Sequence, residues 1–459
     1  MASAGWNWDH NELSAWTSYS SLVPLFYIVR PDLFAVSPSL LFLRERFSSG
    51  ALDWPAITVL LVTGHYLDDE TPFADIRAIP LRATLTWTES EFTIDRDRDP
   101  PPSQPNDFEH AVIRYQSLLD RAIERDLPTL PYTMGLSGGT DSRHILLTLL
   151  NQGREPAMVV TSNHYLSSSS ADTEIAAELG KRVGVAVQSV DPCPDRFRSE
   201  IAKNLAMEFL SLKHSWATEL ARALARYPRL YDGLSGGILF GTSPLTRLVL
   251  RDLENATPSW PGAFESVLAG KYDANAASLL DTISNELINR EHIREGRSRY
   301  EAAFEAFASW PNPARAFDYF NLNQRSAADF TYQMMRNAEV VCPLDSPELV
   351  DLGLGLPWDV STRDDLQDVA IRRFYPELSD IPFVGEYTPR SKNTYFDTKR
   401  ELQTITQLLT AIRGSDTSVL TPNRLQRMTS DEFRLIDIQR MVYVWQLLAL
   451  VEGHATDLS

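Results

Sequence analysis

The strongest constraint on the fold of this chain is a short glycine-containing loop between an apolar strand and a helix. Residues 131–136 predict the strand and residues 142–150 the helix, and the loop between them reads Ser137, Gly138, Gly139, Thr140, Asp141, Ser142. The glycines allow close backbone approach, and the helix N-terminus directs N–H groups at one point. This arrangement indicates an anion site, and it makes a ligand-free glycine turn the less favoured interpretation.

The same order of strand and helix is repeated directly afterwards. Residues 157–161 predict a second strand, and residues 172–182 predict a helix. This alternation is typical of a parallel sheet covered by helices. Beyond residue 200 the apolar periodicity predicts mainly helix, over residues 199–226, 317–338 and 431–452. The expected fold class is therefore α/β, with a large helical C-terminal part.

A segment rich in charge and proline, residues 95–105, favours an exposed, extended connection. We therefore predict two domains, residues 1–105 and 106–459. Short β-rich runs at 32–43 and 81–93 indicate a small β-containing first domain. After the boundary, an Asx cap followed by an acidic residue predicts a helix over about 107–125.

Composition and charge exclude several classes of protein. The formal net charge of −18 over 459 residues argues against a general nucleic-acid binding face. Cys193 and Cys342 are too few and too far apart for a disulfide framework or a zinc site. No apolar stretch approaches the ~18 residues of a membrane helix, and we infer no secretion signal. We expect a cytoplasmic protein with neither nucleic-acid nor membrane partners.

The loop at 137–142 resembles the PP-loop of ATP pyrophosphatases, which cleave ATP between the α and β phosphates. Three further stretches, at residues 158–180, 231–241 and 337–357, make the chain from about 107 to the C-terminus similar to the synthetase domain of the asparagine synthetase family. The resemblance implies a PP-loop parallel sheet, ATP and Mg²⁺ as cofactors, and adenylation of a carboxylate with release of AMP and pyrophosphate.

The resemblance also implies a nucleotide-binding set. It comprises the phosphate loop, two positions flanking the adenine and two on a closing loop: Ser137, Gly138, Gly139, Thr140, Asp141, Ser142, Val160, Thr161, Asp232 and Gly233. Asp141 and Asp232 are the implied metal ligands. The family usually carries a further metal-binding Asp where this chain has Gly237, so either Asp232 substitutes for it or the metal site is weakened.

Two catalytic residues are implied in the same way. Glu339 occupies the place of a catalytic or substrate-facing acid, in a stretch where Val341 replaces the family's Arg. Lys392 lies in a late loop whose lysine contacts the phosphates, and a fixed ammonium suits charge developing there. Taken alone, each of these residues would ordinarily be a solvated surface side chain.

The N-terminal part lacks the cysteine nucleophile of the family's glutaminase domain. Ala2 stands in its place, and no cysteine precedes Cys193. Residues 1–105 resemble a truncated, degenerate Ntn-type glutaminase, so the amine must come from elsewhere. It could be free ammonia, an amine on a second substrate, or an amine within the activated molecule, as in β-lactam synthetases and lasso-peptide cyclases.

The leading hypothesis is an ATP-dependent synthetase that joins a small-molecule or peptide carboxylate to an amine, forming a lactam, macrolactam or other natural-product amide. A precursor peptide or a pathway partner protein could take part. One alternative is an asparagine-synthetase-like ligase that uses free ammonia. Another is a catalytically degenerate nucleotide-binding scaffold, motivated by Gly237. PP-loop tRNA modification is disfavoured by charge and cysteine content. His144 and His164 are expected to be structural.

Overall fold

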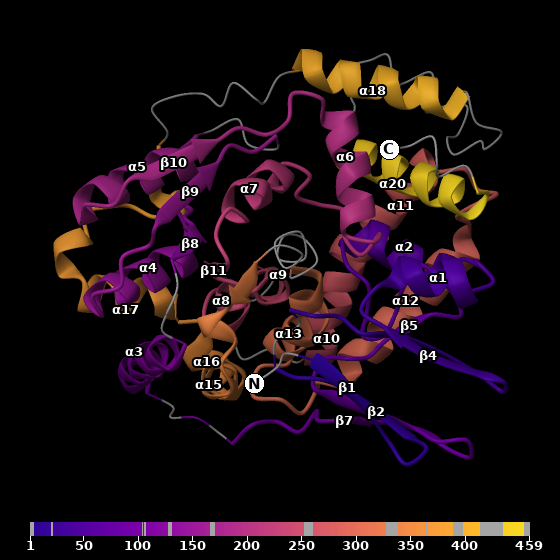
Figure 1. The fold of residues 1–459 in the computed structure, drawn as a ribbon, viewed down its shortest axis with the longest axis horizontal. Coiled ribbons are helices and arrows are strands. Elements are labelled where there is room, and N and C mark those ends of the chain that lie inside the picture. Colours follow the sequence, from indigo (N-terminus) through magenta and orange to yellow (C-terminus); the bar gives the residue numbers. More distant parts are fainter. Residues whose placement is uncertain are drawn as a thin grey trace.

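The computed structural model describes the chain apart from residues 1–3, 20–21, 103, 105–106, 127–130, 166–169, 252–259, 327–337, 364, 389–397, 414–434 and 454–459. The described residues form a mixed α/β structure with one parallel sheet and two antiparallel sheets. In Figure 1 the N-terminal strands, in indigo, lie on one side of the molecule, and the strands of the parallel sheet, mainly in magenta, lie toward the other.

The parallel sheet has five strands in the order β10-β9-β8-β11-β12. Their bounds are Tyr132–Gly135 for β8, Met158–Ser162 for β9, Val187–Val190 for β10, Arg229–Tyr231 for β11 and Glu339–Val341 for β12. The chain builds the sheet outward from β8 in one direction and then returns to place β11 on its other side. Open α/β sheets bind ligands where the strand order reverses in this way, outside the carboxyl ends of the strands. The predicted parallel sheet is confirmed.

The helices predicted around the loop are present with small shifts at their ends. They are α3 (Phe108–Arg125), α4 (Asp141–Asn151) and α5 (Ala171–Val183). Asp107 caps α3 by accepting the backbone N–H of Glu109 at 3.0 Å. One face of α3 is buried in the main core, which also contains apolar residues of α4 and α5.

In the described residues the C-terminal part is mainly helical, and the predicted run at 199–226 contains a break that the sequence pattern did not predict, while residues 327–337 of the run at 317–338 lie outside the described part. The run at 199–226 forms two helices, α6 (Arg196–Ala206) and α7 (Ala217–Leu224), and Glu208, Phe209 and His214 adopt positive φ between them. The other α-helices in the described residues are α8 (Gly236–Leu239), α9 (Pro244–Arg251), α10 (Trp260–Val267), α11 (Ala274–Thr282), α12 (Arg290–Glu305), α13 (Pro313–Ser326), α15 (Pro347–Gly355), α16 (Trp358–Ser361), α17 (Leu366–Phe374), α18 (Thr398–Arg413) and α20 (Leu435–Val451).

The N-terminal residues form two antiparallel sheets and two helices. One sheet has the order β1-β2-β6-β7 and the other β4-β3-β5, with apolar side chains of both sheets packed together. The predicted β-rich run at 32–43 is only partly a strand, because the Ser39 hydroxyl accepts the N–H of Phe42 and begins a helix. The elements are β1 (Ala4–Asp9), β2 (Glu12–Thr17), β3 (Phe26–Arg30), β4 (Leu33–Ser37), α1 (Leu40–Phe47), α2 (Trp54–Thr63), β5 (Arg77–Ala78), β6 (Ala83–Trp87) and β7 (Phe92–Arg96).

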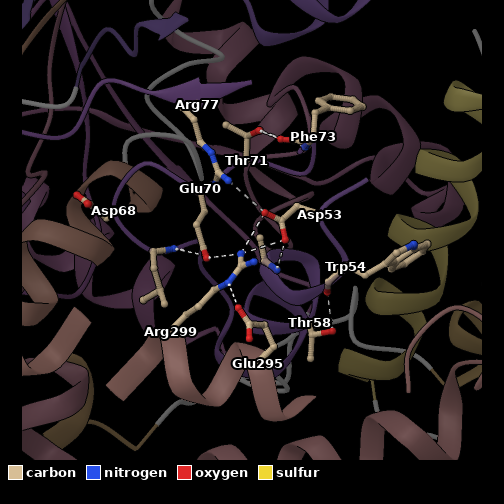
Figure 2. Close-up of polar contacts among 12 residues, drawn as sticks. Asp53, Trp54, Thr58, Asp68, Glu70, Thr71, Phe73, Arg77, Glu295 and Arg299 are labelled. Atoms are coloured by element: carbon tan, nitrogen blue, oxygen red, sulfur yellow. Dashed lines mark hydrogen bonds and ion pairs between the residues drawn. The ribbon is translucent and has the colours of Figure 1, made fainter. Parts of the chain in front are cut away.

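The N-terminal elements pack directly against the C-terminal helices. Helix α2 lies along α12, and Arg299 of α12 bonds the buried carboxylates of Asp53 and Glu70 (Figure 2). The hydroxyls of Tyr66 and Tyr443 are 2.6 Å apart. The residues before and after position 105 therefore share a packed interior. The domain boundary near residue 105 stays a prediction. No helix in the described part of the chain has the length and apolar character needed to cross a membrane.

Candidate functional site

A cavity of about 260 Å³ lies at the carboxyl ends of β8, β9 and β11. This is the place where the order of the strands reverses. Several predicted nucleotide-binding residues line it together, although they come from three separate segments of the sequence: Ser137, Asp141, Ser142, Thr161, Asp232 and Gly233. The fold thus gathers most of the predicted set around one pocket.

The loop before α4 is held in shape largely by its own side chains. Ser142 Oγ accepts the backbone N–H of Ser137 at 3.1 Å and lies 3.2 Å from Ser137 Oγ. Ser137 Oγ accepts the N–H of Gly139 at 3.2 Å. The N–H of Gly138 donates to Asp172 Oδ1 of α5 at 2.8 Å. Two serine hydroxyls and the first turn of α4 therefore define a small polar end of the cavity.

Thr140, which precedes α4, and His144 of α4 bond side chains of the neighbouring helices α17 and α3. The Thr140 hydroxyl donates to Gln367 Oε1 of α17 at 3.2 Å. His144 lies between Gln116 and Tyr115, at 2.7 and 3.3 Å, and burial lowers its pKa to about 3. This neutral, hydrogen-bonded imidazole has the structural role that we expected for it.

Asp141 occupies the first position of α4. Its Oδ2 accepts the N–H of Gly237 at 3.2 Å, and its Oδ1 is buried with no hydrogen-bond partner among the described residues. Burial, and next the charge of Asp365, raise the pKa of Asp141 to about 7. A buried carboxylate with an oxygen that accepts no hydrogen bond would gain from a nearby cation.

Asp232 follows β11 on the other side of the cavity. Its Oδ1 accepts the N–H of Leu234 at 2.8 Å, and burial raises its pKa to about 6. Within the described ranges, no group of three or more His, Cys, Asp or Glu side chains could hold a metal ion. Magnesium is commonly held by one or two carboxylates together with substrate phosphates, so Asp141 and Asp232 fit that smaller role.

The turn after β11 approaches Asp141 so closely that it requires glycine. A Cβ on Gly236 would lie 2.2 Å from Asp141 Oδ1 and 2.6 Å from Leu344 Cδ1, and one on Gly233 would lie 2.8 Å from Asp141 Cβ. At Gly237 a Cβ would be 3.6 Å from Asp141 Oδ2. Gly237 therefore lies beside the Asp141 carboxylate.

Replacing Gly236 by Ala is expected to disturb both the fold and the cavity. The added methyl must displace Asp141 or Leu344, which should cost about 1–3 kcal/mol of unfolding free energy. Urea denaturation measures this cost. Gly385→Ala is the matched control, since nothing lies within 4 Å of a Cβ there. Equal stability of the two variants would contradict the close approach of the turn to Asp141.

Among the described residues, the predicted catalytic residue Glu339 does not line the cavity, and neither do four of the predicted nucleotide-binding residues: Gly138, Gly139, Thr140 and Val160. Glu339 begins β12 beside Arg229, at the amino end of the sheet, and its exposed carboxylate pairs with that guanidinium at 2.8 Å. This placement speaks against a catalytic role. Val160 is buried inside the sheet, where its carbonyl accepts the N–H of Leu136 at 2.8 Å, so only its neighbour Thr161 reaches the cavity. Lys392 lies outside the described residues.

The cavity also contains residues that the sequence did not assign to it. Asp172 bonds the loop, and three aromatic residues, His164, His214 and Trp216, also line the cavity. The interpretation of His164 as merely structural is incomplete, because its side chain lines the cavity. The acidic start of α5 is the one signal in the sequence that pointed to Asp172.

Comparison with models of protein families gave no match, and neither did comparison with curated proteins.

Proposed function

We propose that the chain is an ATP-dependent synthetase with a PP-loop fold, related to the asparagine synthetase family, which adenylates a carboxylate and passes it to an amine. The observation that carries the proposal is the meeting of loop 137–142 with the glycine turn at 233–237, around a buried oxygen of Asp141 that accepts no hydrogen bond from the described residues. A loop that only joined a strand to a helix would have no need of this enclosure.

The roles of the residues follow from their positions. Ser137, Ser142 and the first turn of α4 would bind phosphate oxygens and orient the α-phosphorus toward the carboxylate. Asp141 and Asp232 would hold magnesium, which when bound offsets the negative charge of the phosphates. The glycine turn restricts access of water, which an acyl adenylate must avoid.

The source of the amine is the second part of the proposal. The N-terminal residues would be a degenerate glutaminase-like unit, so the amine would belong to a second substrate or to the activated molecule itself, with a lactam or macrolactam as the product. A precursor peptide or pathway partner protein would then deliver the substrate. Use of free ammonia is the alternative within the same chemistry.

The deciding experiment is exchange of labelled pyrophosphate into ATP, with AMP release measured in parallel, in the presence of magnesium. Amino acids, their derivatives and candidate precursor peptides are tested as carboxylates. Exchange that depends on one of them is the expected result. Asp141→Ala should reduce it at least about 100-fold, by removing an electrostatic contact to the reacting phosphates. Glu339→Gln should retain it, since this side chain lies at the other end of the sheet.

A nucleotide-binding scaffold is the second candidate, favoured by Gly237 beside Asp141 in place of a carboxylate. It predicts binding of ATP with neither exchange nor AMP release for any substrate. Loss of exchange in Glu339→Gln with retention in Asp141→Ala would contradict the proposed site while leaving the reaction class intact.

A further inference from the structure

Two stacked aromatic rings form one side of the cavity. His164 follows the end of β9, and Trp216 directly precedes α7. The centroids of their rings are 3.8 Å apart and the ring planes differ by 22°. Both residues line the cavity that Ser137 and Asp141 line from the polar side. The cavity therefore has a polar end and an aromatic side.

The aromatic side is held by the surrounding fold. Trp216 packs against a buried cluster that includes Val160 and Leu220. The residue after His164 is anchored, because the Tyr165 hydroxyl lies 3.1 Å from Ser199 Oγ. Preorganised rings of this kind lose little conformational freedom when a flat ligand packs on them.

The charge of this side suits a neutral aromatic group rather than a phosphate. Burial lowers the pKa of His164, and the opposing charge of Asp172 does not reverse the shift. The imidazole is therefore neutral at neutral pH. Phosphate would be drawn to the loop and to α4, while a planar conjugated ring would gain most by stacking on the indole and imidazole.

We propose that the stacked pair of His164 and Trp216 is the surface on which the purine base of the nucleotide packs, with Trp216 supplying most of the contact. The inference rests on the proposed function, because it assumes that the ligand of the cavity is ATP. It assigns recognition of the base to side-chain stacking, whereas the family resemblance had implied only that Val160 and Thr161 flank the adenine.

The test is equilibrium binding of α,β-methylene-ATP and of inorganic tripolyphosphate to the full chain, measured by calorimetry. Trp216→Ala should weaken the nucleotide analogue by roughly 5-fold to 100-fold, the usual range for loss of one base–aromatic stack. Tripolyphosphate carries no base, so its affinity should not change. Trp216→Phe should restore most of the affinity for the analogue. Trp6→Ala, at an exposed tryptophan of β1, is the matched control.

A second readout does not depend on Trp216→Ala being folded. The analogue should change the tryptophan fluorescence of the wild-type chain, and the change should disappear in Trp216→Phe while calorimetric binding persists. Two results would overturn the inference and leave the proposed function standing. One is equal affinity of wild type and Trp216→Ala for the analogue, and the other is an equal loss of affinity for the analogue and for tripolyphosphate in that variant. Binding of neither ligand by the wild type would overturn the proposed function and the inference with it.

Discussion

Asp141→Asn is expected to make the ligand-free protein more stable, with a clearly larger gain at pH 8.5 than at pH 5. Burial and Asp365 raise the pKa of Asp141 from its ordinary 3.8 to about 7, so the folded chain binds this proton more tightly than the unfolded chain. The contribution of Asp141 to stability therefore falls as pH rises from about 4 to 7, and the full penalty is present above pH 7. Asparagine carries no charge and avoids it.

The gain at pH 8.5 should be on the order of 2–4 kcal/mol, as a shift of about three units implies. Urea denaturation at the two pH values, without magnesium or nucleotide, measures it. Glu339→Gln is the control for removing one negative charge from an exposed side chain. Magnesium with α,β-methylene-ATP should then stabilise the wild type more than the variant. The stability difference between Asp141→Asn and wild type is the quantity to compare. If the gain of the variant were smaller at pH 8.5 than at pH 5, the buried charge would be contradicted.

The part of the fold that the sequence predicted is the part specified by local signals. The strand, glycine loop and helix around Asp141 follow one another without interruption, so periodicity and glycine placement were sufficient. The break between α6 and α7 lacked such a signal. Glu208 and Phe209 adopt positive φ there, and neither is the glycine that would mark a turn.

The site was predictable only where one segment contributes several residues. Asp172 and Trp216 reach the cavity from different elements, and a single sequence contains no record of which segments pair. The predicted role of Glu339 came from a motif resemblance alone, without any signal from its neighbours in the sheet. The register of β12 with β11 sets Glu339 opposite Arg229, the first residue of that strand. A position within a motif therefore did not determine the end of the sheet at which the side chain lies.

Arg299→Met is expected to lower the unfolding free energy by about 3–5 kcal/mol, the usual cost of breaking a buried ion pair. Its Nη1 donates to both oxygens of Asp53 at 3.0 Å and to Glu70 Oε1 at 3.1 Å, and Nε donates to Glu295 at 3.1 Å (Figure 2). The carboxylates of Asp53 and Glu70 are only 5% and 7% exposed. Methionine fills similar space but leaves both without their main cation.

The pH dependence identifies the cause of that loss. Burial raises the pKa of Glu70 to about 7 even though Arg299 opposes the shift, so removal of the guanidinium should raise it further. Glu70 then stays protonated to higher pH, and the cost of Arg299→Met should be larger at pH 8.5 than at pH 5. Arg294→Met on the same helix is the control, because its pair with Glu291 is exposed and should contribute less than about 1 kcal/mol.

A double variant separates the lost pair from lost packing. Glu70→Gln removes one of the buried charges, so adding it to Arg299→Met should recover part of the stability at pH 8.5, and the two effects should not add. This non-additivity is expected because the penalty of Arg299→Met arises mainly from carboxylates that the N-terminal elements bury against α12. Additive effects, or a cost of Arg299→Met below 1 kcal/mol at pH 8.5, would mean that this ionic cluster does not join the N-terminal elements to the C-terminal helices.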